Sequence, residues 1–233
     1  GFQGRKFFAR SPSTQNFLRF LDFYSKIIIM KINQKKFIEQ QYKDPSKFAK
    51  RRVLHEKFST NKYDWYKWVF DHFNFTAKCK VLELGSGLGT LWLNNQERLQ
   101  KDWDITLSDF SQEMLDKVKE NLEKINHPFH FQLINVENIP YADANFDVVI
   151  ANGLLYLVPD LEKAIKEIAR VIKPGGILIA STSGSKYMKE LEELLGKSNL
   201  PVHRGYTKYS FSSRNFSTTI IYSSGISANF HCS

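Results

Sequence analysis

The chain has 233 residues, 42% of them hydrophobic, so it can bury a sizeable core. One main domain with accessory segments is the natural partition at this length. Its two cysteines, Cys79 and Cys232, exclude a disulfide framework, and no cysteine and histidine cluster has the spacing of metal ligands. The longest apolar run near the start, KIIIMKI, is short and flanked by lysines, so we expect no transmembrane span. We therefore expect a reducing, cytoplasmic location.

The net charge of +9 is unevenly distributed along the chain. Residues 1–76 hold 16 Lys and Arg against 6 Asp and Glu, whereas residues 77–200 hold 14 against 18. The basic excess therefore lies outside the central part of the chain. It could steer an anionic substrate, nucleic acid or a membrane surface. A solvated lysine-rich face explains it equally well, and the sequence leaves both interpretations open.

Residues 1–29 differ in composition from the rest of the chain. They carry five basic residues, one acidic residue and phenylalanines without clear periodicity. We expect a non-native or disordered leader there, with Met30 as the initiator. A basic segment poor in acidic residues also fits an organellar transit peptide, which is the alternative.

The most informative stretch is VLELGSGLGT, from Val81 to Thr90. It reads as a buried strand with Glu83 near its end, followed by a turn with glycine at every second position, Gly85, Gly87 and Gly89. Glycine lacks a Cβ, so a ligand can approach the backbone closely. A turn of this kind between a strand and a helix predicts a nucleotide-type pocket at the carboxyl edge of a parallel sheet.

Strands alternating with amphipathic helices follow this turn. The expected strands are residues 105–109, 129–136, a segment within 146–158 and 177–182, and the expected helices are residues 112–125 and 161–172. Ser111 and Pro159-Asp160 are placed to begin the two helices. The second helix keeps one apolar face, formed by Leu161, Ala164, Ile165, Ile168 and Ile172, and a KPGG turn at residues 173–176 follows it. This alternation predicts a doubly wound, mostly parallel α/β sheet.

The carboxyl end is harder to interpret. Residues 185–197 predict a helix, and the segments TTIIYSS and ISANFHCS could supply the last two strands. Residues 209–233 are rich in serine, carry one charge and show little of the alternation between apolar and polar residues that strands have. Residues 201–233 are thus either the last strands of the sheet or a truncated or frame-altered tail.

Five motifs occur together along the chain: Glu83, Gly85-Ser86-Gly87, Asp109, the late NVENIPY segment and KPGG. As a set they resemble the class I S-adenosylmethionine-dependent methyltransferases, most closely the type 11 methyltransferase domain of a bacterial small-molecule subgroup. The resemblance implies a Rossmann-like sheet and covers residues 81–182. A dinucleotide-binding turn instead requires a third glycine at position 90, which is Thr90 here, so a dehydrogenase is disfavoured.

The resemblance also implies a map of the S-adenosylmethionine site. Gly85, Ser86 and Gly87 would pass under the methionine and ribose, with Glu83 near the amino end and Asp109 accepting hydrogen bonds from the ribose hydroxyls. Phe110 and Met114 would lie along the adenine, Asn135, Val136 and Glu137 at its edge, and Asn152 and Gly153 near the sulfonium. The family commonly has Asp at position 135, and an Asn oxygen can still accept a hydrogen bond there. Plain strand-end capping is the alternative role for Glu83 and Asp109, and a core position is the alternative for Met114.

In such enzymes a helical cap covers the pocket, and we expect residues 30–76 to form it. Arg51 could hold the cofactor carboxylate in fork geometry. Trp65, Trp68, Val69 and Phe73 are expected to pack the cap onto the sheet. Residues 77–200 would then form the cofactor-binding catalytic domain.

The methyl acceptor is expected to be a small molecule. The chain lacks the Asn/Asp-Pro-Pro-aromatic signature after strand four and any recognisable RNA-binding module, so nucleic acid is not favoured. RNA or protein methylation through the basic amino-terminal face, and a catalytically silent cofactor-binding protein, are the alternatives. His55, Tyr156, His203 and Tyr206 could act as a base, but no catalytic residue can be assigned from the sequence. The oligomeric state is left open.

Overall fold

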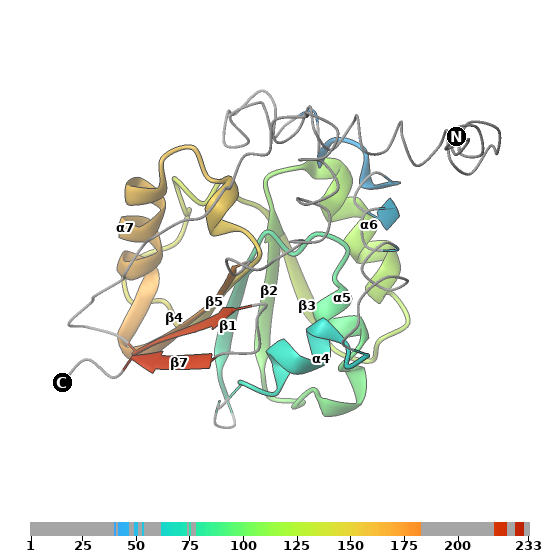
Figure 1. Ribbon diagram of the computed structural model, residues 1–233, viewed down its shortest axis with the longest axis horizontal. Coiled ribbons are helices and arrows are strands. Elements are labelled where there is room, and N and C mark those ends of the chain that lie inside the picture. Colours follow the sequence, from blue (N-terminus) through green and yellow to red (C-terminus); the bar gives the residue numbers. More distant parts are fainter. Residues whose placement is uncertain are drawn as a thin grey trace, which may run out of the picture.

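The structure is a computed structural model that describes residues 40, 42–46, 49–50, 53, 62–73, 75 and 78–182, together with the backbone of residues 217–222 and 227–230. These residues form a seven-stranded sheet with the order β3-β2-β1-β4-β5-β6-β7 (Figure 1). The strands are β1 (Lys80–Leu84), β2 (Asp104–Asp109), β3 (Phe129–Leu133), β4 (Phe146–Asn152), β5 (Ile172–Thr182), β6 (Ser217–Tyr222) and β7 (Ser227–Phe230). Neighbouring strands pair in parallel except β6 and β7, which are antiparallel. The predicted mostly parallel α/β sheet is confirmed, and both strands expected near the carboxyl end are present.

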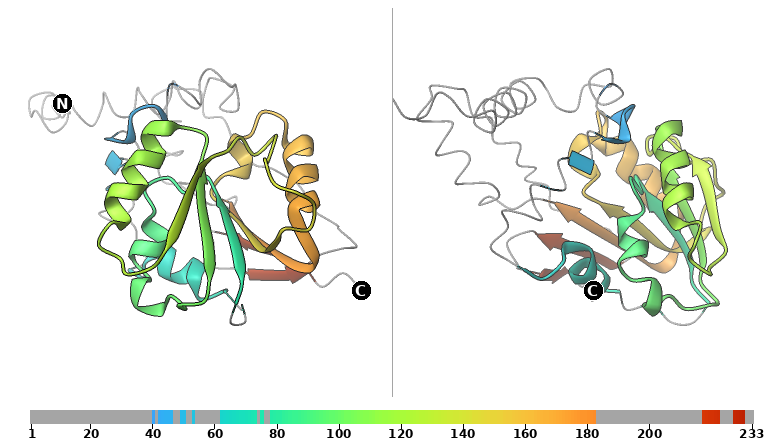
Figure 2. Two further views of the ribbon diagram at one scale, coloured as in Figure 1. Left: turned by 180° about the vertical axis from the view of Figure 1, so that it is seen from behind. Right: turned by 90° about the vertical axis from the view of Figure 1, so that its right-hand side faces the viewer.

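Helices cover both faces of the sheet, as a doubly wound fold requires (Figures 1 and 2). The helices are α4 (Trp65–Phe70), α5 (Thr90–Leu93), α6 (Gln112–Leu122) and α7 (Leu161–Val171), with short 3-10 turns η1 (Gln96–Arg98) and η2 (Leu155–Leu157). One apolar cluster joins the sheet to α7, and a second joins its other face to α4, α5 and α6. Successive side chains of a strand point to opposite faces, so β1 sends Leu82 and Leu84 into the first cluster and Val81 into the second.

Aromatic side chains dominate the second cluster. Trp92 is fully buried, and its ring lies edge-on to Phe70 with 6.4 Å between centroids. Val69 belongs to the cluster, and Trp65, Trp68 and Phe73 pack against it. This confirms that the aromatic residues before β1 attach their segment to the sheet.

The predicted helix starts are confirmed. Ser111 accepts a hydrogen bond from the Met114 N–H, and Asp160 accepts one from the Lys163 N–H, so each side chain caps its helix. The core face of α7 ends at the fully buried Val171, whereas Ile172, expected on that face, already begins β5. The strand expected over residues 129–136 ends at Leu133, and the segment after it bonds to Glu167 of α7 and to its N-cap Asp160.

The predicted KPGG turn is reproduced in part: the segment interrupts the pairing of β5 with β4, and regular pairing resumes at Ile177, but β5 already begins before it at Ile172. Those residues lie within the bounds of β5, where Phe146 of β4 pairs with Ile172 and Val148 pairs with Ile177. The register shift leaves the glycines unpaired in the ladder, and Gly175 has φ +77°. A bulge of this kind bends the strand locally without ending it.

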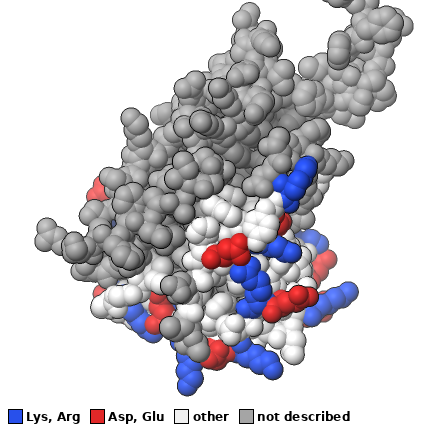
Figure 3. Space-filling model, turned by 60° about the horizontal axis from the view of Figure 1, so that its bottom comes forward, with Lys and Arg blue, Asp and Glu red and all other residues white. Residues whose placement is uncertain are grey.

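Acidic and basic side chains are interspersed on the described surface shown in Figure 3. None of the described helices combines the length and apolar character needed to cross a membrane. The leader at 1–29, the helix expected at 185–197 and Cys232 lie outside the described residues, whereas Cys79 is buried.

Gly89 has a packing role that a substitution can test. A Cβ at this position would lie 2.5 Å from Val118 Cγ2 on α6, and the residue has φ +71°. Gly175 has a similar φ but no described atom within 4 Å of a Cβ. We expect Gly175→Ala to lower the free energy of unfolding by roughly 1–2 kcal/mol through backbone strain alone. Gly89→Ala should lose about 1–3 kcal/mol more through overpacking, measured by urea denaturation. Equal losses in the two variants would contradict the contact with α6.

Candidate functional site

The glycine-rich turn lies at the carboxyl end of β1 and is fixed to the neighbouring strand. The Ser86 N–H donates to the Ser108 carbonyl of β2 at 2.8 Å, and the Ser108 hydroxyl donates to the Glu83 carbonyl at 2.7 Å. Gly85 and Gly87 have φ of 68° and 57°, so the backbone turns through the left-handed region. The turn is therefore held in one shape by β2.

Asp109 ends β2 and faces this turn. Its Oδ2 accepts the Gly87 N–H and its Oδ1 accepts the Ser111 N–H, both at 3.1 Å. The residue is 5% exposed, and burial raises the pKa of its carboxyl to about 6 against the lowering effect of these bonds. A carboxylate oxygen can accept more than one hydrogen bond, so both oxygens retain capacity for a ligand hydroxyl.

Glu83 lies deeper in the same corner of the fold and is 2% exposed. Its Oε2 accepts the Trp92 Nε1–H at 2.5 Å. Burial raises the pKa of Glu83 to about 7, the indole bond opposes the rise, and the nearby Asp109 charge adds to it. Two carboxyl groups thus lie at the ends of adjacent strands, and both are poised to change charge near neutral pH.

The residues predicted to lie along the adenine surround the start of α6. Met114 is fully buried, whereas Phe110 is half-buried and lies edge-on to Tyr42 with 6.2 Å between ring centroids. The Ser111 hydroxyl also donates to the Tyr42 carbonyl at 3.2 Å. The amino-terminal segment therefore reaches the predicted base-binding side of the site.

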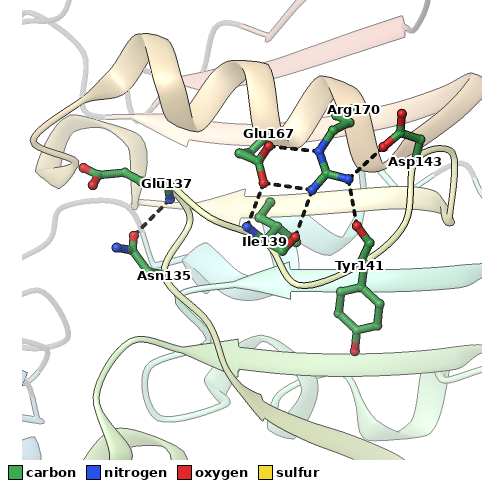
Figure 4. Close-up of polar contacts among 7 residues, drawn as sticks. All are labelled: Asn135, Glu137, Ile139, Tyr141, Asp143, Glu167 and Arg170. Carbon is green, nitrogen blue, oxygen red and sulfur yellow. Dashed lines mark hydrogen bonds and ion pairs between the residues drawn. The ribbon is translucent and has the colours of Figure 1, made fainter.

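The segment after β3 carries the three residues predicted at the adenine edge, of which Figure 4 shows Asn135 and Glu137. Asn135 is exposed, and its Oδ1 accepts the Glu137 N–H at 2.9 Å. Val136 is buried in the first apolar cluster, and Glu137 Oε1 accepts the Asp160 N–H at 2.9 Å. The Asn135 oxygen is thus partly engaged by its own turn, although an amide oxygen can accept a second hydrogen bond.

Asn152 and Gly153 stand at the end of β4, beside the end of β5. The Ser181 hydroxyl donates to Asn152 Oδ1 and accepts the Gly153 N–H at 2.9 Å. A Cβ on Gly153 would meet no described atom within 4 Å, so the chain is open there. These contacts fix the backbone where β4 and β5 end at the carboxyl edge of the sheet.

The structure therefore gathers the predicted residues at the carboxyl ends of β1, β2, β3 and β4. Arg51 lies outside the described residues, as do His55, His203 and Tyr206, and Tyr156 is half-buried in η2. Sequence reasoning missed Trp92, Ser181 and Tyr42. Ser181 is opposite Asn152 in the β4–β5 register, which only strand pairing reveals. Neither Trp92 nor Tyr42 belongs to a local motif, so the sequence held no signal for them.

A family model described as a methyltransferase domain matches residues 75–214, more than half of the chain. The chain belongs to the class I S-adenosylmethionine-dependent methyltransferases. The match confirms the predicted family, and with it S-adenosylmethionine as the family's cofactor. Assignment to the type 11 subgroup stays a prediction.

Curated relatives include enzymes named for quinone biosynthesis. The chain is 28% identical to a demethylmenaquinone methyltransferase of Staphylococcus haemolyticus over 66% of this chain and 72% of that protein. It is 31% identical to the ubiquinone/menaquinone biosynthesis C-methyltransferase UbiE of Geotalea daltonii over 63% of this chain and 65% of the relative. For the UbiE protein of Cronobacter sakazakii the match spans 55% of the relative's length.

Solved structures support the fold. A chain from the complex of the Haloferax volcanii Trm112 methyltransferase activator with a protein described as a methyltransferase aligns with a TM-score of 0.52. The two chains are 17% identical, and the alignment covers 70% of each. At this identity the likeness concerns the architecture of the sheet and its helices.

The residues at this edge of the sheet fit the family's cofactor. Among the described residues, the buried Ser86 hydroxyl has no hydrogen-bond partner, as expected for a group that faces a ligand. The Asp109 carboxylate lies within hydrogen-bonding distance of the turn. No described atom lies within 4 Å of a Cβ on Gly153, which leaves space at the end of β4. Donors, acceptors and room are thus present together.

Glu83→Gln tests the buried carboxyl. The pKa of Glu83 is about 7 in the folded protein, against an ordinary value of 4.5. Between these two pH values the carboxyl is therefore protonated in the native protein and ionised in the unfolded chain. Stability from this proton is full below pH 4.5 and is lost as pH rises through about 7. The amide resembles the protonated acid and keeps an oxygen for Trp92. Relative to wild type, the free energy of unfolding of the variant should therefore rise by on the order of 2 kcal/mol between about pH 5 and about pH 8.

The matched control is Glu123→Gln, which changes an exposed carboxylate at the end of α6. Its free energy of unfolding should stay parallel to that of the wild type across the same pH range in urea titrations. The same parallel course for Glu83→Gln would contradict a buried carboxyl that titrates near neutral pH.

Proposed function

We propose that this protein transfers the methyl group of S-adenosylmethionine to a small organic acceptor. The observation that carries the proposal is the pair of buried carboxyl groups, Glu83 and Asp109, on either side of a left-handed glycine turn at the ends of β1 and β2. Such a corner offers a hydroxyl-binding carboxylate and a closely approachable backbone to one ligand.

The proposed site extends along the carboxyl edge of the sheet. Asp109 would accept the ribose hydroxyls, the turn from Gly85 to Gly87 would lie under the methionine and ribose, and Ser86 would donate its free hydroxyl. Phe110 and Met114 would contact the adenine, with Asn135, Val136 and Glu137 at its edge. Asn152 and Gly153 would lie near the sulfonium, Glu83 near the amino end and Arg51 near the carboxylate. Each of these roles is a prediction that ligand binding can test.

The electrostatics of the corner favour a cationic ligand. Burial raises the pKa values of both carboxyl groups, and the Asp109 charge raises that of Glu83 further, so a bound positive charge would favour the ionised forms of both. The sulfonium and the ammonium of S-adenosylmethionine carry such charge. A dinucleotide brings a pyrophosphate instead, which the two carboxylates would repel, and Thr90 replaces the third glycine of its binding turn.

The chemistry requires little from the protein beyond positioning. The sulfonium cofactor supplies an electrophilic methyl group, and the chain must hold an acceptor in line with it and keep water out. Positioning of this kind can contribute roughly 7–11 kcal/mol to lowering a barrier. A base is needed only for an acceptor that must lose a proton. The half-buried Tyr156 on η2 is the candidate that lies within the described residues.

The relatives favour a small acceptor. Proteins named as demethylmenaquinone and ubiquinone/menaquinone C-methyltransferases match the chain at 28–31% identity. Their names make a quinol ring the first acceptor to test. Methylation of RNA or protein remains the alternative, because the basic excess of residues 1–76 suits an anionic partner. A catalytically silent cofactor-binding protein is a further alternative.

Asp109→Asn is the decisive test of the cofactor site. We expect it to weaken binding of S-adenosylhomocysteine roughly a hundredfold by isothermal titration calorimetry, because two hydrogen bonds to a charged acceptor are weakened. In the wild type the affinity should also fall as pH drops below about 6, roughly tenfold per pH unit, because protonation removes the carboxylate. The variant should lack this step.

Asp104→Asn is the control, since this exposed carboxylate begins the same strand and pairs with His130 at 3.3 Å. It should bind as the wild type does. A folded wild type that binds no S-adenosylhomocysteine would overturn the cofactor site, and equal binding by Asp109→Asn would remove Asp109 from it.

Acceptor class can be tested by following the label from methyl-tritiated S-adenosylmethionine. With demethylated quinols, bulk RNA and bulk protein offered separately, we expect label in the organic extract of the quinol reaction alone. Asp109→Asn serves as the inactive control. Label in RNA or protein would replace the small-molecule acceptor, and cofactor binding without transfer to any of them would favour the silent protein.

A further inference from the structure

The segment between β3 and β4 is held by one side chain of α7. The Arg170 guanidinium donates to two backbone carbonyls of this segment, Tyr141 at 2.7 Å and Ile139 at 2.9 Å, and to the Asp143 carboxylate at 2.9 Å (Figure 4). Arg170 and Glu167 come from successive turns of α7, and Figure 4 shows both pointing toward the segment. One planar group thus fixes three points of a single stretch of chain.

Glu167 completes this contact from the other side. Its carboxylate accepts Arg170 Nε at 2.9 Å and Nη2 at 2.8 Å, and it also accepts the Ile139 N–H at 2.8 Å. The bond to Arg170 lowers the pKa of Glu167, so the pair stays charged over the working range of pH. Ile139 is therefore held at both its N–H and its carbonyl, by two side chains that orient one another.

The segment has little regular structure of its own. Between Leu133 and Phe146 its ladder contact is an isolated bridge from Asn135 to Asn138, and the Tyr141 N–H donates to the Ile139 carbonyl. Its backbone groups need partners to remain in one conformation. Arg170 and Glu167 supply three of them, so the shape of the segment depends on the two side chains.

The same segment is tied to the candidate site at its other end. The Ile134 N–H donates to the Asp109 carbonyl at 2.9 Å, and Glu137 is bound to the start of α7 through the Asp160 N–H. The stretch that contains Asn135 and Glu137 is therefore bonded to the end of β2 on one side. On the other side it is bonded to both ends of α7. A change at Arg170 can reach them without touching Asp109.

We propose that Arg170 and Glu167 are positioning residues for base recognition, which hold residues 135–143 in the shape that distinguishes adenine from other bases. The inference rests on the proposed function, because it takes residues 135–137 as the edge that meets the adenine. Neither side chain touches the ligand. Their effect passes through the backbone of the segment and appears as base selectivity.

A purely stabilising role makes a different prediction. Ion pairs between partly exposed side chains contribute little to global stability, and here the side chains of Arg170 and Glu167 are 30% and 20% exposed. Loss of stability alone would weaken the binding of every ligand of the site equally. Loss of the segment's shape would weaken the binding only of ligands that are recognised through the adenine edge.

The experiment compares S-adenosylhomocysteine with S-inosylhomocysteine, which lacks the exocyclic amine of adenine, by calorimetry on the full chain. We expect the wild type to prefer the adenine ligand. Arg170→Lys keeps the charge but loses the planar fork, and it should weaken binding of the adenine ligand about tenfold, or about 1.4 kcal/mol, while binding of the inosine ligand stays nearly unchanged. Glu167→Gln should reduce the preference in the same way, and it replaces Arg170→Lys if that variant does not fold.

Arg98→Lys is the matched control. Arg98 also pairs with a carboxylate, Asp71 at 2.9 Å, and lies 4.5 Å over the Phe70 ring, but it belongs to η1 and has no contact with residues 135–143. Its base preference should equal that of the wild type. Equal losses for both ligands, no loss for either, or a wild type without preference would overturn the role of Arg170 while leaving the cofactor site intact. A wild type that binds neither ligand would overturn the proposed function and this role with it.

Discussion

The contact on which the site depends is the hydrogen bond from the Gly87 N–H to the buried Asp109 carboxylate. It joins the turn after β1 to the end of β2, which the Ser86 N–H and the Ser108 carbonyl also connect. The same carboxylate accepts the Ser111 N–H at the start of α6. One side chain therefore fixes a turn, a strand end and a helix start relative to one another.

This arrangement has a cost in stability. Burial opposes the charge of both Glu83 and Asp109 and raises their pKa values to about 7 and about 6. A fold optimised only for stability would bury apolar groups at these positions. Two buried acids beside a left-handed turn are therefore evidence of a ligand, because bound hydroxyls and positive charge would compensate for the lost hydration.

The rest of the fold makes this corner rigid. Trp92 is buried in the second apolar cluster, with Val81 of β1, and donates to Glu83. The aromatic residues of α4 pack in the same cluster. On the opposite face of the sheet, α7 packs along β4 and β5 and holds the segment after β3 through Arg170. Each face of the sheet thus stabilises the site: the aromatic cluster around Trp92 on one face, and the Arg170 guanidinium of α7 on the other.

The sequence by itself determined the order of strands and helices, the helix caps at Ser111 and Asp160, and the corner formed by Glu83, the glycine turn and Asp109. The caps and the strand-turn-helix pattern are local, since they need only neighbouring residues. The corner follows from the parallel sheet, because the carboxyl ends of adjacent parallel strands meet at one edge. Tertiary structure alone decided that Trp92 is the partner of Glu83, that Ser181 fixes Asn152, and that Arg170 holds residues 139–143. Those contacts join residues 9 to 31 positions apart across packed elements, so no local spacing encodes them. The KPGG bulge likewise depends on how β5 pairs with β4, which is a property of the sheet.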